Sequence, residues 1–183
     1  MPPQVHDYFK LERLYLAHLD QICELEPLIY GVNCWSRKSF VNEINNPSSS
    51  YFTLLERPTK VIGYGGYWDL GEEGHITTLA ISPEYQGLKL GEYLFLQLLK
   101  DAIKQNITQL TLEVRSGNHK AQSLYKKYRF DISGIRPNYY RDNQEDAVIM
   151  WAVDLQTPDY RKLLIDREDL VGRDILSSCL AYR

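Results

Sequence analysis

The sequence lacks the features that mark secreted, membrane-spanning or nucleic-acid-binding chains. Its 183 residues include 3 scattered cysteines without a CxxC pair, which excludes a disulfide scaffold and favours reduced thiols in a cytosol. No uncharged stretch approaches the ~20 apolar residues of a membrane span, and the first residues have no apolar signal core. The 21 basic residues do not outnumber the 24 acidic ones. We therefore expect a cytoplasmic protein with no direct nucleic-acid partner and no membrane partner.

What the sequence does contain is the composition of a folded globular chain. Hydrophobic residues make up 44% and charged residues 25% of it. A chain of this length buries about two-thirds of its unfolded surface and needs no cross-links. We expect one domain over residues 1–154 and an appendage over residues 155–183. In the appendage Pro158 is expected to break the chain, and Leu163 to Leu180 to form a weak helix.

The first half of the chain predicts two helices followed by antiparallel hairpins. A short strand is expected at 8–15, a helix from His18 to Leu28, and a second helix after Ser36, a residue type suited to the N-cap position. Turn residues then separate three β-like segments, at 51–55, 61–70 and 75–81.

After Ser82-Pro83 the apolar period changes from two residues to about 3.6, which predicts a strand-helix-strand-helix core. The helix carries a wide apolar stripe at Leu94, Phe95, Leu98, Leu99, Ala102 and Ile103. A strand is expected at 109–114, and Asn118 suits the N-cap of the next helix. The last strands, at 130–135 and 147–153, are expected to be joined by a long polar loop. The fold class is therefore mixed α/β.

One candidate site lies where a strand ends in Leu79-Ala80-Ile81 and a glycine-containing loop, Gln86 to Gly91, leads into a helix. The first turn of a helix offers unpaired N–H groups and a partial positive charge, which suit a pyrophosphate. Glycine-rich loops are common, so a plain strand-turn-helix in which the glycines serve the turn remains an equal alternative at this point.

Two further residues are candidates for acid and base chemistry. Glu113 interrupts an apolar strand near its end and shares a face with Thr111 and Arg115. Tyr125 lies on the helix that follows Asn118. Taken alone, Glu113 is more often a solvated glutamate, and Tyr125 is more often a core aromatic residue at helical spacing.

Together these segments, over residues 8–153, resemble the GCN5-related N-acetyltransferases (GNAT superfamily), and within it the RimI-type ribosomal-protein-alanine N-acetyltransferases. The loop Gln86-Gly87-Leu88-Lys89-Leu90-Gly91 corresponds to the acetyl-CoA loop of the whole superfamily. More specific are the motifs that follow in order: Leu112 to Arg115, Asn118, Leu124-Tyr125, Phe130, Asn138-Tyr139-Tyr140 and Glu145 to Met150. The resemblance implies a central, mostly antiparallel sheet flanked by helices. We expect the strands near 75–81 and 109–114 to lie side by side and to splay apart at the loop after Ile81.

The resemblance also implies an activity. It is the direct transfer of acetyl from acetyl-CoA, without a metal, to the α-amino group of an N-terminal alanine in a basic small-subunit ribosomal protein. Glu113 is then the base, acting through a water molecule, and Tyr125 is the acid or hydrogen-bond donor for the leaving thiolate. Another amine (other protein N-termini, lysine, a polyamine) and a non-catalytic acyl-CoA-binding module are the alternatives.

The binding residues are likewise implied by the resemblance. The acetyl-CoA residues would be Leu79, Ala80, Ile81, Gln86, Gly87, Leu88, Lys89, Leu90, Gly91, Glu92 and Asn118. The peptide residues would be Trp35, Tyr139, Tyr140 and Glu145. Lys89 stands where the family usually has its first glycine; a lysine can still hold a helical φ/ψ there, and its ammonium can supplement the phosphate site.

Overall fold

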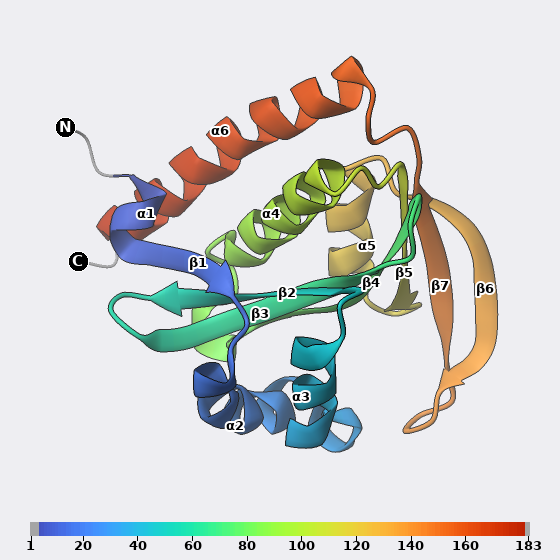
Figure 1. The fold of residues 1–183 in the computed structure, drawn as a ribbon, viewed down its shortest axis with the longest axis horizontal. Coiled ribbons are helices and arrows are strands. Elements are labelled where there is room, and N and C mark those ends of the chain that lie inside the picture. The colour runs from blue at the N-terminus through green and yellow to red at the C-terminus, as the bar shows by residue number, and fades with distance from the viewer. Residues whose placement is uncertain (1–3, 182–183) are drawn as a thin grey trace.

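A computed structural model describes residues 4–181 and shows one seven-stranded sheet with helices on both faces (Figure 1). The strand order is β1-β2-β3-β4-β5-β7-β6, and the pairing is antiparallel except between β4 and β5. The strands are β1 (Phe9–Arg13), β2 (Ser49–Glu56), β3 (Lys60–Asp69), β4 (Glu73–Ile81), β5 (Gln109–Arg115), β6 (Asp131–Tyr140) and β7 (Glu145–Ala152). The expected mixed α/β fold is confirmed.

The helices divide between the two faces of the sheet. On one face lie α2 and α3, and on the other lie α4, α5 and α6 (Figure 1). The helices are α1 (Val5–Tyr8), α2 (Leu19–Tyr30), α3 (Arg37–Asn45), α4 (Leu90–Lys104), α5 (His119–Lys126) and α6 (Pro158–Ala181). Short 3₁₀ turns occupy η1 (Leu16–His18), η2 (Gly31–Asn33) and η3 (Pro83–Tyr85). Of the helices in the described residues, none has the length and apolarity to cross a bilayer.

Local sequence signals account for most of these elements. The Ser36 hydroxyl accepts a hydrogen bond from the Ser39 N–H at 3.1 Å, and the Asn118 side chain accepts one from the Ala121 N–H at 3.0 Å. Both expected N-caps are therefore confirmed. The apolar stripe of α4, the six residues from Leu94 to Ile103 given above, is buried between the sheet and α6.

The parallel strands β4 and β5 lie side by side as expected, but they separate earlier than expected. Their pairing runs from Glu73 opposite Gln109 to Ile76 opposite Leu112 and then stops. Beyond that point β4 remains paired with β3 up to Ile81, and β5 remains paired with β7. Beyond Ile76, β4 and β5 are therefore no longer paired with each other. The split begins after Ile76 and not at the loop after Ile81.

Two other expectations were wrong. The polar segment before β7 is mostly strand, because β6 continues to Tyr140 and leaves a turn of residues 141–144. The strand β6 lies at the edge of the sheet, and nearly all its residues are exposed. Its sequence therefore lacks the alternation of apolar and polar residues that would predict a strand. Pro158 begins α6 instead of breaking the chain, because the first turn of a helix has no intrahelical acceptor for the N–H that proline lacks.

The helix α6 is packed onto the rest of the molecule. Its residues Tyr160, Leu164, Val171 and Ile175 are buried, in clusters shared with α4. The Tyr160 hydroxyl donates a hydrogen bond at 2.9 Å to the carbonyl oxygen of Tyr128. The C-terminal segment is thus a strongly packed helix of 24 residues and not a weak one.

Candidate active site

A cleft of about 560 Å³ opens where β4 and β5 separate. One wall comes from β4 and the end of β3, another from β5 and α5, and the remainder from α2, the segment between α2 and α3, and β6. Its lining brings together seven of the 17 candidate residues, among them Glu113 and Tyr125, with several that the sequence did not single out. The lining residues used below are Glu26, Tyr30, Asn33, Trp35, Trp68, His75, Glu113, Arg115, Asn118, Tyr125, Arg136, Tyr139 and Tyr140.

Glu113 lies in this cleft with both carboxylate oxygens engaged. Its Oε2 is 2.8 Å from the His75 Nε2, and its Oε1 is 3.1 Å from a guanidinium nitrogen of Arg136. The side chain is 9% exposed. The hydrogen bond with His75 lowers the pKa of Glu113 below its ordinary value and outweighs the opposing effect of burial. Glu113 is therefore an ionised carboxylate that can accept a proton at neutral pH.

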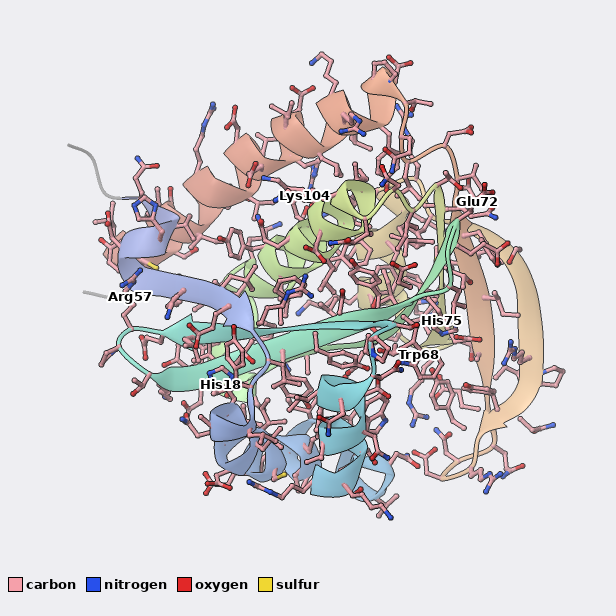
Figure 2. All side chains as sticks on the ribbon, in the orientation of Figure 1. His18, Arg57, Trp68, Glu72, His75 and Lys104 are labelled. Atoms are coloured by element: carbon pink, nitrogen blue, oxygen red, sulfur yellow. The ribbon has the colours of Figure 1, made fainter. Side chains whose placement is uncertain are left out.

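His75 is a site residue that the sequence analysis missed. It faces Trp68 across the β3–β4 pair, with the ring centroids 5.8 Å apart, and Figure 2 shows the two side chains next to each other. It reaches Glu113 because the parallel register sets His75 opposite Thr111, two positions before Glu113. A histidine in a β segment was a visible signal, but this register could not be read from the sequence.

Tyr125 lines the same cleft as Glu113, from the last turn of α5. Its ring packs against Phe95 and Phe130, at centroid distances of 5.0 and 6.2 Å. Burial raises the pKa of its phenol above the ordinary value. Within residues 4–181 its hydroxyl has no hydrogen-bond partner, so it can serve as a donor to a bound group.

The β6–β7 hairpin is held over the cleft by Arg115. The guanidinium donates to both oxygens of Asp142 at 3.0 and 3.2 Å and to Glu145 at 3.1 Å, and it stacks 3.9 Å from the Tyr140 ring centroid. Glu145 also accepts the Gly117 N–H at 2.8 Å, and this bond is the main reason that its pKa falls to about 2. Both oxygens of Glu145 are therefore occupied within the chain.

The opposite wall contains a second buried carboxylate, Glu26 of α2. It accepts the Trp35 N–H at 2.6 Å and the Tyr64 hydroxyl, and burial raises its pKa. The Trp35 ring lies against Phe40, at a centroid distance of 5.4 Å, while Trp35 still lines the cleft. A glutamate within an apolar helix was a signal that the sequence analysis did not use.

The α2–α3 connection lies near the β6–β7 turn. The Asn33 side chain in η2 lies near the Asp142 carboxylate in the β6–β7 turn, and together with the hydrogen bonds from Arg115 it lowers the pKa of Asp142. Asp142 is held by Arg115 of β5, so the β6–β7 turn is fixed to β5 next to the α2–α3 connection.

The loop before α4 differs from our expectation at Lys89. Its φ of 64° and ψ of 3° are left-handed, not helical, and it is the N-cap of α4. Its Nζ lies 3.7 Å from Glu92 and 3.9 Å from Asp174 of α6, so the ammonium faces two carboxylates. The first-turn N–H groups of α4 have no intrahelical acceptors, and the edge of β4 facing β5 is unpaired beyond Ile76. This arrangement suits an extended amide chain that ends in a pyrophosphate.

The remaining candidate residues have mainly local contacts. The Gln86 side chain donates to the Ile81 carbonyl oxygen at 3.1 Å, and Asn118 lines the cleft while it caps α5. Tyr139 is 45% exposed on the hairpin. Within the described residues there is no group of three or more His, Cys, Asp or Glu side chains with the geometry to hold a metal ion.

Comparison with known proteins places this geometry in a family. Residues 19–130 match the model of the acetyltransferase (GNAT) family. A Bacillus subtilis protein, provisionally named ribosomal protein bS18-alanine N-acetyltransferase, is 38% identical over 141 residues, which are 77% of this chain and 93% of that protein. The Escherichia coli K12 ribosomal protein bS18-alanine N-acetyltransferase is 33% identical over 119 residues, 63% of this chain and 78% of its own.

The fold comparison agrees with the sequence comparison. The crystal structure of the ribosomal-protein-S18-alanine N-acetyltransferase from Escherichia coli superposes with a TM-score of 0.73 at 27% identity. The superposition covers 80% of this chain and 94% of that one. The family-matched range ends at residue 130, so α6 lies entirely beyond it.

Proposed function

The chain belongs to the acetyltransferase (GNAT) family, and from this premise we propose that it acetylates the α-amino group of an N-terminal alanine in a basic small-subunit ribosomal protein. It is an acetyl-CoA-dependent N-acetyltransferase. The substrate is supported by the relatives named for ribosomal protein bS18. The observation that carries the proposal is that Glu113 and Tyr125 line one cleft at the split between β4 and β5. We further propose residues 1–154 as the acetyltransferase domain.

Glu113 is proposed as the base. An α-amino group has a pKa of about 7.7–8.0, against about 10.4 for lysine, so roughly a tenth of it is already neutral at pH 7. The ionised Glu113 therefore needs to remove a proton only from the remaining ammonium form, through a bridging water. His75, which is hydrogen bonded to Glu113, orients the carboxylate and is placed to share that proton.

Tyr125 is proposed as the hydrogen-bond donor to the leaving thiolate. In water a phenol at pKa about 10 is already a weaker acid than a thiol at about 8.5, by roughly 2 kcal/mol. Burial raises the pKa of Tyr125 further, which disfavours complete proton transfer. A hydrogen bond from the otherwise unpaired hydroxyl stabilises the thiolate without that cost.

Acetyl-CoA is proposed to lie between the separated strands. The unpaired edge of Leu79-Ala80-Ile81 would pair with the amides of its pantetheine arm, and Asn118 would contact the same arm. The N–H groups of the loop from Gln86 to Gly91 and of Glu92 would receive the pyrophosphate. The open strand edge and the free first turn of α4 supply the donors that such a ligand requires.

The peptide is proposed to enter beneath the hairpin, between Trp35 and the pair Tyr139-Tyr140. Because both oxygens of Glu145 are occupied, we propose that it shapes this groove through Arg115 and does not touch the peptide. Asn33 and Asp142 lie near each other beside this groove, and that proximity favours a chain end over a residue inside a chain. These contacts favour an α-amine over a lysine side chain.

A thiol-release assay with acetyl-CoA tests the proposal. The substrates are a basic peptide that begins with alanine, the same peptide with a blocked N-terminus and a free lysine, and spermidine. We expect turnover on the first peptide and little on the others. Preference for the blocked peptide or for spermidine would favour the alternative amines, and binding of acetyl-CoA without turnover on any amine would favour a non-catalytic module.

A further inference from the structure

The helix α6 lies outside the family-matched residues and yet contacts the first turn of α4. The two helices lie next to each other on the same face of the sheet (Figure 1). Val171 and Ile175 of α6 share a buried cluster with Leu90 and Leu94 of α4. The part of α4 that α6 covers therefore includes the turn at which the pyrophosphate is proposed to bind.

A buried carboxylate lies at this contact. Glu92, in the first turn of α4, is only 5% exposed. It is paired with Arg167 of α6, and its Oε2 is 3.0 Å from the Lys127 Nζ and 3.7 Å from the Lys89 Nζ. Burial alone would raise the pKa of Glu92, but the hydrogen bonds from Lys127 and Arg167 outweigh it and lower that pKa.

The charges around Glu92 are almost balanced. We call Lys89, Glu92, Lys127, Arg167 and Asp174 the Glu92 cluster; it holds three cations and two carboxylates, so its net charge is 3 − 2 = +1. Without Arg167 the sum is zero, and the negative charge of Glu92, in the same turn of α4 as the proposed anion site, would be less compensated. The low exposure of Glu92 increases the effect of this lost compensation, because solvent screens a buried charge less than an exposed one.

We infer that Arg167 is a positioning residue of the acetyl-CoA site: by neutralising the Glu92 carboxylate it allows the first turn of α4 to accept the pyrophosphate. The inference rests on the proposed function, because it needs acetyl-CoA at that turn. It makes α6 a part of the ligand site and not merely an addition to the core. Arg167 approaches Glu92 through one terminal nitrogen and also lies 5.7 Å from the Tyr128 ring centroid, which fixes its place between α4 and α5.

Titration calorimetry with acetyl-CoA, without any peptide, tests the inference. Arg167→Met should raise the Kd at least about tenfold, which corresponds to ~1.4 kcal/mol. The matched control is Glu168→Gln, which breaks the 2.7 Å pair between α6 and Lys100 of α4. Lys100 lies eight positions from Glu92, about 12 Å along the helix. Both variants should lower the thermal midpoint, but Glu168→Gln should leave the Kd within about twofold.

Two further variants separate charge from packing. The double variant E92Q/R167M removes both members of the pair, and its Kd for acetyl-CoA should lie within about threefold of the wild-type value, which recovers most of the affinity that Arg167→Met loses. Asp174→Asn, at an aspartate whose side chain is 55% exposed and whose change should not affect folding, raises the cluster charge by one and should tighten binding. If Arg167→Met does not fold, these two variants decide the question.

The outcomes distinguish the inference from the proposed function. If the wild-type protein binds no acetyl-CoA at millimolar concentration, the proposed function fails. If it binds, and Arg167→Met and Glu168→Gln have the same Kd, α6 only stabilises the fold and the inference is wrong. An unchanged or weaker affinity in Asp174→Asn, or no recovery in E92Q/R167M, would also overturn it.

Discussion

At the scale of single residues, the chemistry depends on how Glu113 is kept ionised and accessible. Its two oxygens face different partners, His75 on β4 and Arg136 on β6. Both partners favour the charged form, since a nearby cation or donor stabilises a carboxylate. Arg136 is half-exposed, so its contribution is partly screened and smaller than that of the more buried His75.

Arg136→Gln should shift the acid limb of the pH–rate profile upward. Removing the guanidinium raises the pKa of Glu113, so the base is protonated, and activity is lost, at a higher pH than in the wild type. The shift should be a fraction of a pH unit because Arg136 is half-exposed. It is measured as kcat/KM for an alanine-starting peptide between about pH 3.5 and 6, the range that includes the ordinary glutamate pKa. Arg141→Gln, in the turn of the same hairpin, is the matched control and should leave the limb in place.

Lys89 has a backbone conformation that an L-residue adopts at a cost. Its φ of 64° predicts that Lys89→Gly is more stable than Lys89→Ala by about 1 kcal/mol, although both lack the ammonium. Urea unfolding of the pair measures this difference. For Lys89→Gly the Kd for acetyl-CoA should change by less than tenfold, roughly 1.4 kcal/mol. The Lys89 ammonium is 41% exposed and 3.7 Å from Glu92, so solvent screens it more than the Arg167 guanidinium, which is 22% exposed and in direct contact with Glu92. Equal stability of the two variants would contradict a left-handed Lys89.

At the scale of elements, the position of the β6–β7 hairpin depends on the contacts of a single residue, Arg115. Arg115 holds Asp142, Glu145 and the Tyr140 ring together. Charge-assisted hydrogen bonds of this kind are about twice as strong as neutral ones. The position of Tyr139 and Tyr140 over the cleft therefore depends on a strand residue that is not itself on the hairpin.

Arg115→Met should loosen the hairpin and weaken peptide binding. We expect the KM for the peptide to rise at least about tenfold while the Kd for acetyl-CoA stays the same, since the strand edge and the α4 turn are untouched. Steady-state kinetics and calorimetry on one preparation give both values. A rise in the acetyl-CoA Kd with an unchanged peptide KM would show that the hairpin is not the peptide wall.

Helix starts and single strands could be predicted from the sequence, whereas the pairing between distant strands could not. Ser36 and Asn118 cap helices through contacts three residues away, and β5 alternates buried and half-buried residues along its own length. Those patterns are local in the sequence, and they correctly predicted the two helix starts and the strand. The pairing of His75 with Glu113 and the length of β6 depend on register between distant strands. No local pattern encodes that register, so those features of the site were missed.

At the scale of the whole molecule, ion pairs join elements that are distant in sequence. Glu92 links α4 to α6, Glu113 links β5 to β4 and β6, and Glu168 links α6 to α4. The pKa of each of these carboxyls is lowered in the folded protein. Groups with a lowered folded pKa stabilise the native state above their unfolded pKa and lose that contribution as pH falls through the folded value.

The free energy of unfolding should therefore decline below about pH 4.5, the region of the unfolded glutamate pKa. Urea denaturation at pH 7, 5 and 4 measures it. The variant E92Q/R167M lacks one of the coupled carboxylates and should show a shallower decline than the wild type. A stability that is flat from pH 7 to pH 4 would contradict the lowered pKa values of these glutamates.

The central claim is that Glu113 accepts the proton of an α-amine, and the turnover of Glu113→Gln as a function of pH tests it most directly. A positioned base contributes typically ~10²–10⁴-fold, and the low end is expected for an amine that is already partly neutral. The loss should be about 10²-fold at pH 6.5 and should shrink above about pH 8, where the free amine needs no base. Tyr125→Phe, which removes a donor, should lose turnover at both pH values. An equal loss in Glu113→Gln at pH 6.5 and pH 9 would contradict a proton-accepting role and leave Glu113 as a structural or substrate-positioning residue.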